Sequence, residues 1–226
     1  MKSELRLIHL KDKYKEKTGI IIGGGPSIKQ LIDRNFPFNE LDESYNNITI
    51  GTNMSYTIMD TDYLVFMDRY FWHTFYKDVK KLKNTIALTQ LERECGDKLK
   101  VPLSVGTVRI QSKGIFYPLM DGKVKCNNTG SSALSIANYM GISKIYLFGF
   151  DMCLDQENNK NFHNAYAKKA KSVKLTNANI NNHYLNISNI INTLTKLNTQ
   201  VYSCSKISRL NDIIPYVNPK TLISTE

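Results

Sequence analysis

The chain has 226 residues, 42% of them hydrophobic and 10% aromatic, enough for the buried core of one large domain. No apolar run reaches the roughly 20 residues that cross a bilayer, which argues against a transmembrane protein. The 30 basic residues outnumber the 20 acidic ones and give a formal charge of +10. This charge favours an anionic partner such as nucleic acid, an anionic membrane face or a phosphorylated substrate, although a solvated lysine-rich surface also accounts for it.

The N-terminal 17 residues are charged throughout and lack the apolar segment of a signal peptide. We therefore expect a cytoplasmic protein, or one in the host cytoplasm if a phage encodes it. A short helix is predicted over residues 11–17. The cysteines lie far apart and form no C-x-x-C pair, which argues against a zinc site or a disulfide framework.

The most informative segment, residues 17–31, reads KTGIIIGGGPSIKQL. Ile20–Ile22 is typical of a buried parallel strand, and a helix is predicted to follow as far as Arg34. Between them lies a glycine corner made of Gly23, Gly24, Gly25, Pro26 and Ser27. Such a corner can present backbone N–H groups to an anion, although a tight turn without a ligand also fits. The dinucleotide fingerprint needs glycine at Ile28 and a P-loop needs Gly-Lys-Ser/Thr, so both are disfavoured.

Strands and helices are predicted to alternate along the whole chain. The expected strands cover residues 20–22, 47–52, 63–67, 85–88, 144–148 and 201–203. The expected helices cover residues 27–34, 54–59, 69–76, 128–140 and 184–197, with a short closing helix from residue 208. The aromatic helix 69–76 could stack a base, but burial of one face against the sheet explains most of its rings. Gly141 is expected to end the helix before it.

This alternation predicts an α/β fold, namely a doubly wound, mostly parallel Rossmann-like sheet with helices on both faces and a lid-like insertion. We expect one nucleotide-binding domain over residues 1–226. Residues 91–127 would form a flap and residues 152–182 a lid.

Ligands bind such sheets beyond the carboxyl ends of the strands. Besides the glycine corner, the residues expected there are Asn53, Asp68, Asn128, Thr129, Gly130, Ser131, Gly149 and Asp151. Their coincidence favours a nucleotide or nucleotide-sugar site over a bare structural turn. No metal site is expected for sugar transfer, whereas Asp68 and Asp151 could hold a divalent cation in a phosphotransferase. Asp151 could equally orient its own loop.

Proton transfer would need a titratable side chain near this site. His163 and His183 both follow Asp151 in a polar region, and histidine has a pKa suited to a general base. An exposed histidine without a catalytic task is the competing reading for each.

Five short motifs occur in a definite order between Thr18 and Val217: GGGPS, an Asn after the second strand, a strand ending in Asp, NTGSSAL and IYLFGFDM. This pattern resembles a family of phage- and bacterial-encoded proteins related to bacterial lipooligosaccharide sialyltransferases and to archaeal 6-hydroxymethylpterin diphosphokinase-like proteins. The sialyltransferase branch implies a Rossmann-like fold and a CMP- or UDP-linked sugar as donor.

The same resemblance implies roles for donor-site residues. Residues 24–27 would lie at the donor phosphate and Asn53 at the nucleotide. Residues 128–130, Asn-Thr-Gly here, match the family's Thr-Ser-Gly donor-binding turn with the first two positions changed. Asp68 stands where the sialyltransferases have an asparagine.

The family's reactive residues match less well. Tyr184 matches a tyrosine that helps the donor phosphate depart. The general-base histidine of the sialyltransferases would fall three residues later, where this chain has Ile187. Either His183 or His163 acts as the base instead, or the reaction differs.

The sequence therefore predicts a glycosyltransferase-like enzyme that moves a sugar from a nucleotide-sugar donor to a hydroxyl acceptor. The positive charge suits an anionic acceptor, either a glycan or a modified DNA base. The diphosphokinase branch instead implies ATP at the same corner with magnesium on the aspartates, and a non-catalytic nucleotide-binding protein is a third interpretation. The sequence is compatible with a homo-oligomer.

Overall fold

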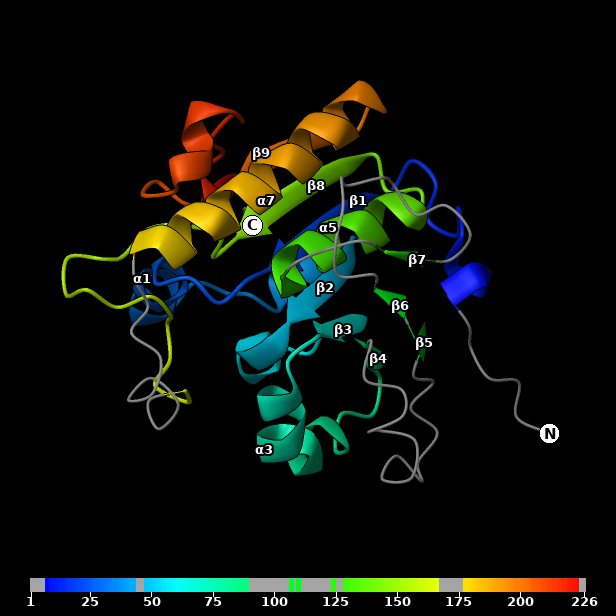
Figure 1. The fold of residues 1–226 in the computed structure, drawn as a ribbon, viewed down its shortest axis with the longest axis horizontal. Coiled ribbons are helices and arrows are strands. Elements are labelled where there is room, and N and C mark those ends of the chain that lie inside the picture. The colour runs from blue at the N-terminus through cyan, green and yellow to red at the C-terminus, as the bar shows by residue number, and fades with distance from the viewer. Residues whose placement is uncertain are drawn as a thin grey trace.

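The computed structural model of the chain describes residues 7–43, 47–89, 106–107, 109–110, 123–124, 128–166 and 177–223. A parallel sheet runs through its centre (Figure 1) in the strand order β5-β4-β3-β2-β1-β8-β9. The strands are β1 (Thr18–Ile22), β2 (Ile48–Thr52), β3 (Tyr63–Phe66), β4 (Ile86–Thr89), β5 (Gly106–Thr107), β8 (Lys144–Phe148) and β9 (Gln200–Ser203). The short β6 (Arg109–Ile110) and β7 (Lys123–Val124) pair separately. Most of the predicted flap lies outside the described residues.

All pairings between these strands are parallel, with six strands of four or five residues and the two-residue β5 at one edge. This confirms the predicted Rossmann-like α/β sheet. The helices are α1 (Ser27–Asp33), α2 (Glu40–Glu43), α3 (Arg69–Val79), α5 (Thr129–Tyr139) and α7 (Asn177–Lys196), with short 3₁₀ helices η1 (Leu7–Leu10), η2 (Asn53–Thr57), η3 (Arg209–Asp212) and η4 (Pro219–Leu222). None of the described helices is both long and apolar enough to span a bilayer.

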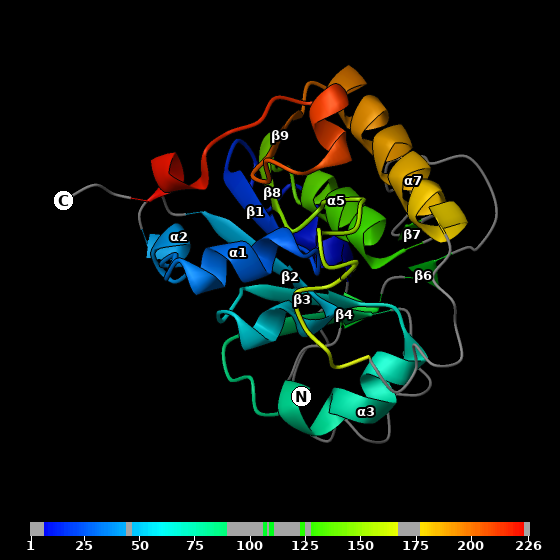
Figure 2. The ribbon, with the colours of Figure 1, turned by 90° about the vertical axis from the view of Figure 1, so that its left-hand side faces the viewer.

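Helices cover both faces of the sheet (Figure 2): α1 and α2 lie on one side, and α5 and α7 on the other. The isoleucines of β1 show how the sequence achieves this. Ile21 packs in the cluster that contains α5 and α7 residues, whereas Ile20 and Ile22 pack with Ile28 of α1. Because successive side chains of a strand point to opposite faces, an unbroken apolar run is what a strand buried on both sides requires.

A third cluster lies between the sheet and α3. Phe71 and Trp72 are fully buried there, and the Trp72 ring stacks on Phe66 with centroids 5.6 Å apart and planes 3° from parallel. The predicted packing role of the aromatic helix is thus confirmed for these residues.

One predicted helix and the predicted start of another were wrong. Residues 11–16 form turns instead of a helix, because Asp12 and Glu16 have φ values of 53° and 65° that a helix does not allow. Helix α7 begins at residue 177, seven residues before the predicted start. The expected helix end at Gly141 is confirmed by its φ of 85° and by its N–H, which donates to Asn138 O at 2.9 Å.

The sheet places the ends of β1 and β8 side by side. β1 pairs with β2 on one edge and with β8 on the other, and Ile22 is in register with Phe148. From β1 the chain moves outward through β2, β3 and β4, then returns to β8 on the opposite side. The strand order therefore reverses between β1 and β8, the position where ligands bind in open α/β sheets.

Candidate functional site

The glycine corner after β1 is joined to the loop that follows β8. The Gly23 N–H donates to Phe148 O at 2.7 Å, and the Gly25 N–H donates to Gly149 O at 2.8 Å. A Cβ atom on Gly23 would lie 2.5 Å from Gly149 O. Gly23 and Gly25 are therefore required by the close approach of two backbones, whatever ligand binds nearby.

The Asp151 side chain, in the loop after β8, is hydrogen-bonded to Ser27 at the start of α1. Its two carboxylate oxygens accept the Ser27 N–H at 2.8 Å and the Ser27 hydroxyl at 2.7 Å. The side chain is 1% exposed, and burial raises its pKa against the opposing effect of the Ser27 hydrogen bonds. This geometry matches the alternative in which Asp151 orders its own loop.

Gly24 differs from the glycines on either side. Within the described part of the chain, its N–H has no hydrogen-bond acceptor, while its carbonyl accepts the Phe162 N–H at 3.1 Å. A Cβ atom at Gly24 would meet only Asn161 Oδ1, at 3.7 Å. In the predicted phosphate-binding corner, the backbone N–H groups of Gly23, Gly25 and Ser27 donate hydrogen bonds within the protein. The N–H of Gly24 therefore stays available to a ligand.

Asn53 follows β2 directly and begins η2 with φ of 49°, a left-handed conformation that asparagine tolerates better than most residues. Its Oδ1 is buried and has no hydrogen-bond partner in the described structure. An unpaired buried amide oxygen costs free energy, so a ligand donor at this position would be stabilising.

Asn128 caps α5. Its Oδ1 accepts the Ser131 N–H at 2.8 Å, and its carbonyl accepts the Ser132 N–H at 3.1 Å. Its Nδ2 is buried without a partner among the described residues. The Ser131 N–H is used by this cap. Gly130 lies against the Phe150 ring, which a Cβ atom at this position would approach to 2.8 Å.

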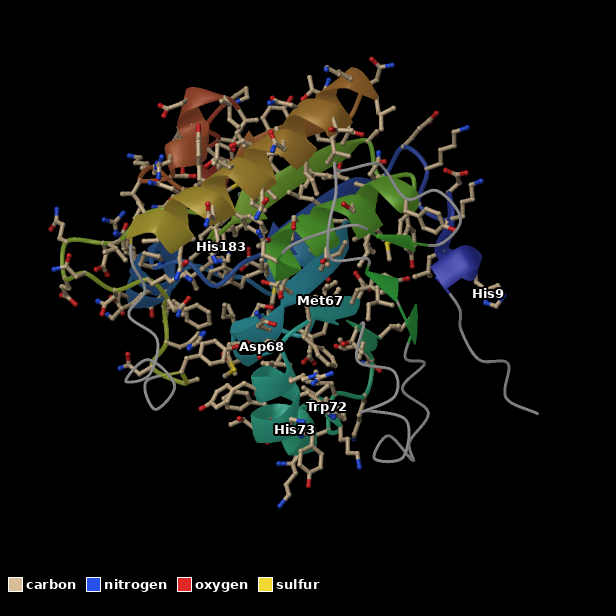
Figure 3. The ribbon with its side chains drawn as sticks, viewed as in Figure 1. His9, Met67, Asp68, Trp72, His73 and His183 are labelled. Atoms are coloured by element: carbon tan, nitrogen blue, oxygen red, sulfur yellow. The ribbon has the colours of Figure 1, made fainter. Side chains whose placement is uncertain are left out.

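Asp68 lies beyond β3 and caps α3, where its Oδ1 accepts the Tyr70 N–H at 2.7 Å. Figure 3 places it next to Met67 at the end of the strand. Asp68 and Asp151 follow β3 and β8, which are three positions apart in the sheet. Both carboxylates accept hydrogen bonds within the fold, Asp68 from Tyr70 and Asp151 from Ser27. No cluster of three metal-ligating side chains occurs within the described ranges.

His163 lies in an aromatic cluster. Its ring contacts Phe162 and Tyr166 edge-on, with centroids 4.7 and 5.1 Å away, and its Nδ1 accepts the Ala165 N–H at 3.2 Å. Burial lowers the pKa of His163 to about 4. The lone pair that would take a proton is thus occupied by the backbone.

His183 and Ile187 lie one turn apart on α7 and therefore on the same face of the helix. Ile187 is 1% exposed, in the core beside Gly130. His183 is half-buried and lies near the start of α7, as Figure 3 shows. Burial, together with the nearby charge of Lys160, lowers its pKa, so its imidazole is neutral and able to accept a proton near pH 7.

Tyr184 follows His183 on α7, and its ring contacts Arg209 of η3. The guanidinium of Arg209 lies over its ring, 4.4 Å from the centroid. Arg209 also donates to Asn181 Oδ1 at 2.6 Å and, through its N–H, to Asp151 O at 3.0 Å. The residues that sequence reasoning missed are Lys160, Asn161 and Arg209, because only the tertiary fold brings them next to the motifs.

The fold resembles those of two solved glycosyltransferases. One is the MAf glycosyltransferase from Magnetospirillum magneticum AMB-1, with a TM-score of 0.56 and 9% identity over 93% of this chain, which spans 35% of that protein. The other is the sialyltransferase CstII from Campylobacter jejuni in complex with the substrate analogue CMP-3FNeuAc, with a TM-score of 0.51 and 14% identity over 93% of this chain and 88% of that one. At such low identity the likeness concerns the fold alone.

No protein-family model matches the sequence, and no curated protein is significantly similar to it. The part of the predicted resemblance that structure comparison supports is therefore the common fold with glycosyltransferases.

Proposed function

We propose that the protein is a glycosyltransferase that takes a sugar from a CMP- or UDP-linked donor. The observation that carries the proposal is that two of the unsatisfied buried amide atoms, Asn53 Oδ1 and Asn128 Nδ2, belong to residues predicted to bind the nucleotide. Asn53 follows β2, the strand next to β1, and Asn128 precedes α5, which contacts both of these strands. A nucleotide supplies both donors and acceptors and would satisfy an amide oxygen and an amide N–H together.

The donor phosphate would lie between the Gly24 N–H and the start of α5. The Thr129 and Gly130 N–H groups belong to the first turn of an 11-residue helix, where backbone donors and the helix dipole favour an anion. These groups would stabilise the negative charge that grows on the phosphate as the sugar leaves.

His183 would act as general base. It would take the proton of the acceptor hydroxyl while the acceptor oxygen bonds to the anomeric carbon, and the bond from that carbon to the phosphate oxygen would break with its electron pair on the nucleotide. The lowered pKa of His183 keeps the imidazole free for this step. Tyr184, held under Arg209, would lie on the neighbouring flank of α7 as a support for the departing phosphate.

Calorimetric titration with CMP, UDP and ATP, each with and without magnesium, tests the proposal. We expect CMP or UDP to bind without metal, and the Asn53→Ala and Asn128→Ala variants to bind it at least tenfold more weakly. Binding of ATP alone, dependent on magnesium, would favour the phosphotransferase interpretation. Binding of none of the three would contradict any nucleotide-dependent function.

An anionic acceptor is proposed from the net charge of +10. Of the two candidate classes, DNA can be tested by a gel shift at moderate salt, because binding that depends on charge neutralisation weakens steeply with ionic strength. Absence of a shift would leave an anionic glycan as the proposed acceptor.

A further inference from the structure

Lys160 is a half-buried cation with no compensating acid among the described residues. Burial lowers the pKa of its ammonium group. In the described structure no carboxylate pairs with it, whereas the exposed Lys29 pairs with Asp33. Its titratable neighbour is His183, whose pKa the positive charge of Lys160 lowers. Removing a cation from water is costly unless an anion pairs with it, so an anion from outside the chain would stabilise the ammonium.

The segment around Lys160 is fixed on both sides. Asp155 holds the preceding turn, because its Oδ1 accepts the N–H groups of Glu157 at 2.9 Å and Asn159 at 2.7 Å. After Lys160, the Phe162 ring packs against both the α1 cluster and the α3 cluster. Lys160 is therefore held by anchored backbone instead of by a free loop.

The same segment lies against the open glycine of the corner. The Phe162 N–H donates to Gly24 O at 3.1 Å, and Asn161 Oδ1 would be 3.7 Å from a Cβ atom at Gly24. The residue before these two is Lys160. The backbone of Lys160 thus lies directly before the two residues that contact Gly24, and its long side chain starts beside this corner. A backbone N–H without an acceptor in the described structure, a side-chain amide and an ammonium group are all groups that bind phosphate oxygens.

We infer that Lys160 binds the donor phosphate beside the Gly24 N–H and stabilises the charge left on it when the sugar departs. This inference rests on the proposed function, since it assigns one further residue to the same donor site. Residue 160 falls within the segment 152–182 that the sequence predicts as a lid, where no motif points to a role for it.

The test compares nucleotide and nucleoside binding in matched variants. We expect Lys160→Met to weaken CMP or UDP binding by tenfold or more, the usual effect of losing a charge-assisted hydrogen bond, and to leave cytidine or uridine binding unchanged. Lys196→Met is the control, because it removes the same charge from an exposed position at the far end of α7 and should bind nucleotide like the wild type. The salt dependence of nucleotide binding should also decrease in Lys160→Met alone.

The outcomes separate the two proposals. If the wild type binds neither CMP nor UDP, the proposed function fails. If the wild type binds one of them and the folded Lys160→Met or Lys160→Gln variant binds it equally well, the role of Lys160 is overturned while the proposed function stands. Thermal unfolding shows whether each variant is folded. Because the half-buried Lys160 ammonium has no acidic partner in the described structure, its removal should not lower the unfolding midpoint.

Discussion

At the scale of single residues, the three consecutive glycines of the corner have different structural roles. Gly23 and Gly25 lie against the loop after β8, and a Cβ atom on Gly25 would come within 2.4 Å of Asp151 Oδ2 and 2.6 Å of Gly149 O. Gly24 has open space and an N–H without an acceptor in the described structure. A phosphate-binding corner could be predicted from the motif, but which amide is available depends on a loop over 120 residues away.

This difference predicts that the same substitution, glycine to alanine, destabilises the protein at position 25 but has little effect at position 24. Gly25→Ala should lower the free energy of unfolding by about 1–3 kcal/mol, because the added methyl forces apart backbone and carboxylate atoms that cannot move away cheaply. Gly24→Ala should change it by less than about 0.5 kcal/mol, as surface substitutions usually do. Urea denaturation of both variants measures the effect, and equal destabilisation would contradict the assigned packing.

The two candidate histidines should also differ in their effect on turnover. His183→Asn should reduce kcat about 10²- to 10⁴-fold, the usual loss of a general base. His163→Asn should change kcat only a few-fold, since the His163 Nδ1 accepts a backbone N–H. Steady-state release of nucleotide from the bound sugar donor measures both, and a larger loss in His163→Asn would reverse the assignment.

The lowered pKa of His183 fixes the direction of the pH dependence. A base must be deprotonated to act, and the pKa of His183 lies below the ordinary value of 6.5. The value of kcat/KM should therefore fall in acidic solution with a midpoint below pH 6.5. In Lys160→Met the fall should begin at higher pH, because the neighbouring charge that helps to lower the pKa is gone.

At the scale of elements, α5 and α7 show where sequence patterns suffice. Helix α5 was predicted almost to the residue because Asn128 caps its start and Gly141 ends it, both local signals. Helix α7 begins earlier than predicted because residues 177–183 read NANINNH, where Ile180 is the one large apolar side chain. Ala178 and Ile180 are two positions apart, which gives no helical periodicity, so tertiary packing decides this boundary.

Helix α7 buries residue 187, the position at which the resemblance to sialyltransferases would place a histidine. Ile187 is buried in the core next to α5, so Ile187→His should lower the free energy of unfolding by about 2–5 kcal/mol through lost packing and an unpaired imidazole. The matched variant Ile187→Leu should cost less than about 1.5 kcal/mol. Denaturant unfolding distinguishes the two variants.

Adding Ile187→His to the His183→Asn variant should not restore turnover. Recovery of turnover in this double variant would show that the general base belongs at position 187.

At the scale of the whole molecule, alternation of strands and helices was enough to predict the fold class, because each element carries its own periodicity. The sequence could not predict the segment over Gly24, since residues 152–166 form irregular structure held by scattered contacts such as those of Asp155 and Phe162. Their effect on the site depends on packing between distant parts of the chain, which no local pattern records.

The contribution of His163 to stability should fall in mild acid. The unfolded chain protonates this histidine near pH 6.5, whereas burial lowers the pKa of folded His163 to about 4. Between these values His163 binds more protons in the unfolded state, so its contribution to the free energy of unfolding decreases as the pH falls from 6.5 towards 4. The raised pKa of Asp151 acts in the opposite direction. Urea unfolding at several pH values measures the net slope, and His163→Phe should remove the part that His163 contributes. NMR titration of the His163 ring provides an independent check, and an ordinary midpoint near 6.5 would contradict the expectation.

The hydrogen bonds from Ser27 to Asp151 join residues 124 positions apart. During synthesis, the corner after β1 leaves the ribosome long before β8 exists to receive its backbone. The first half of the chain therefore cannot complete the corner by itself, because its hydrogen-bond partners arrive only when β8 pairs with β1. Such distant pairing is slow to form, so we expect assembly of the sheet centre to be a late step in the folding of newly made chains.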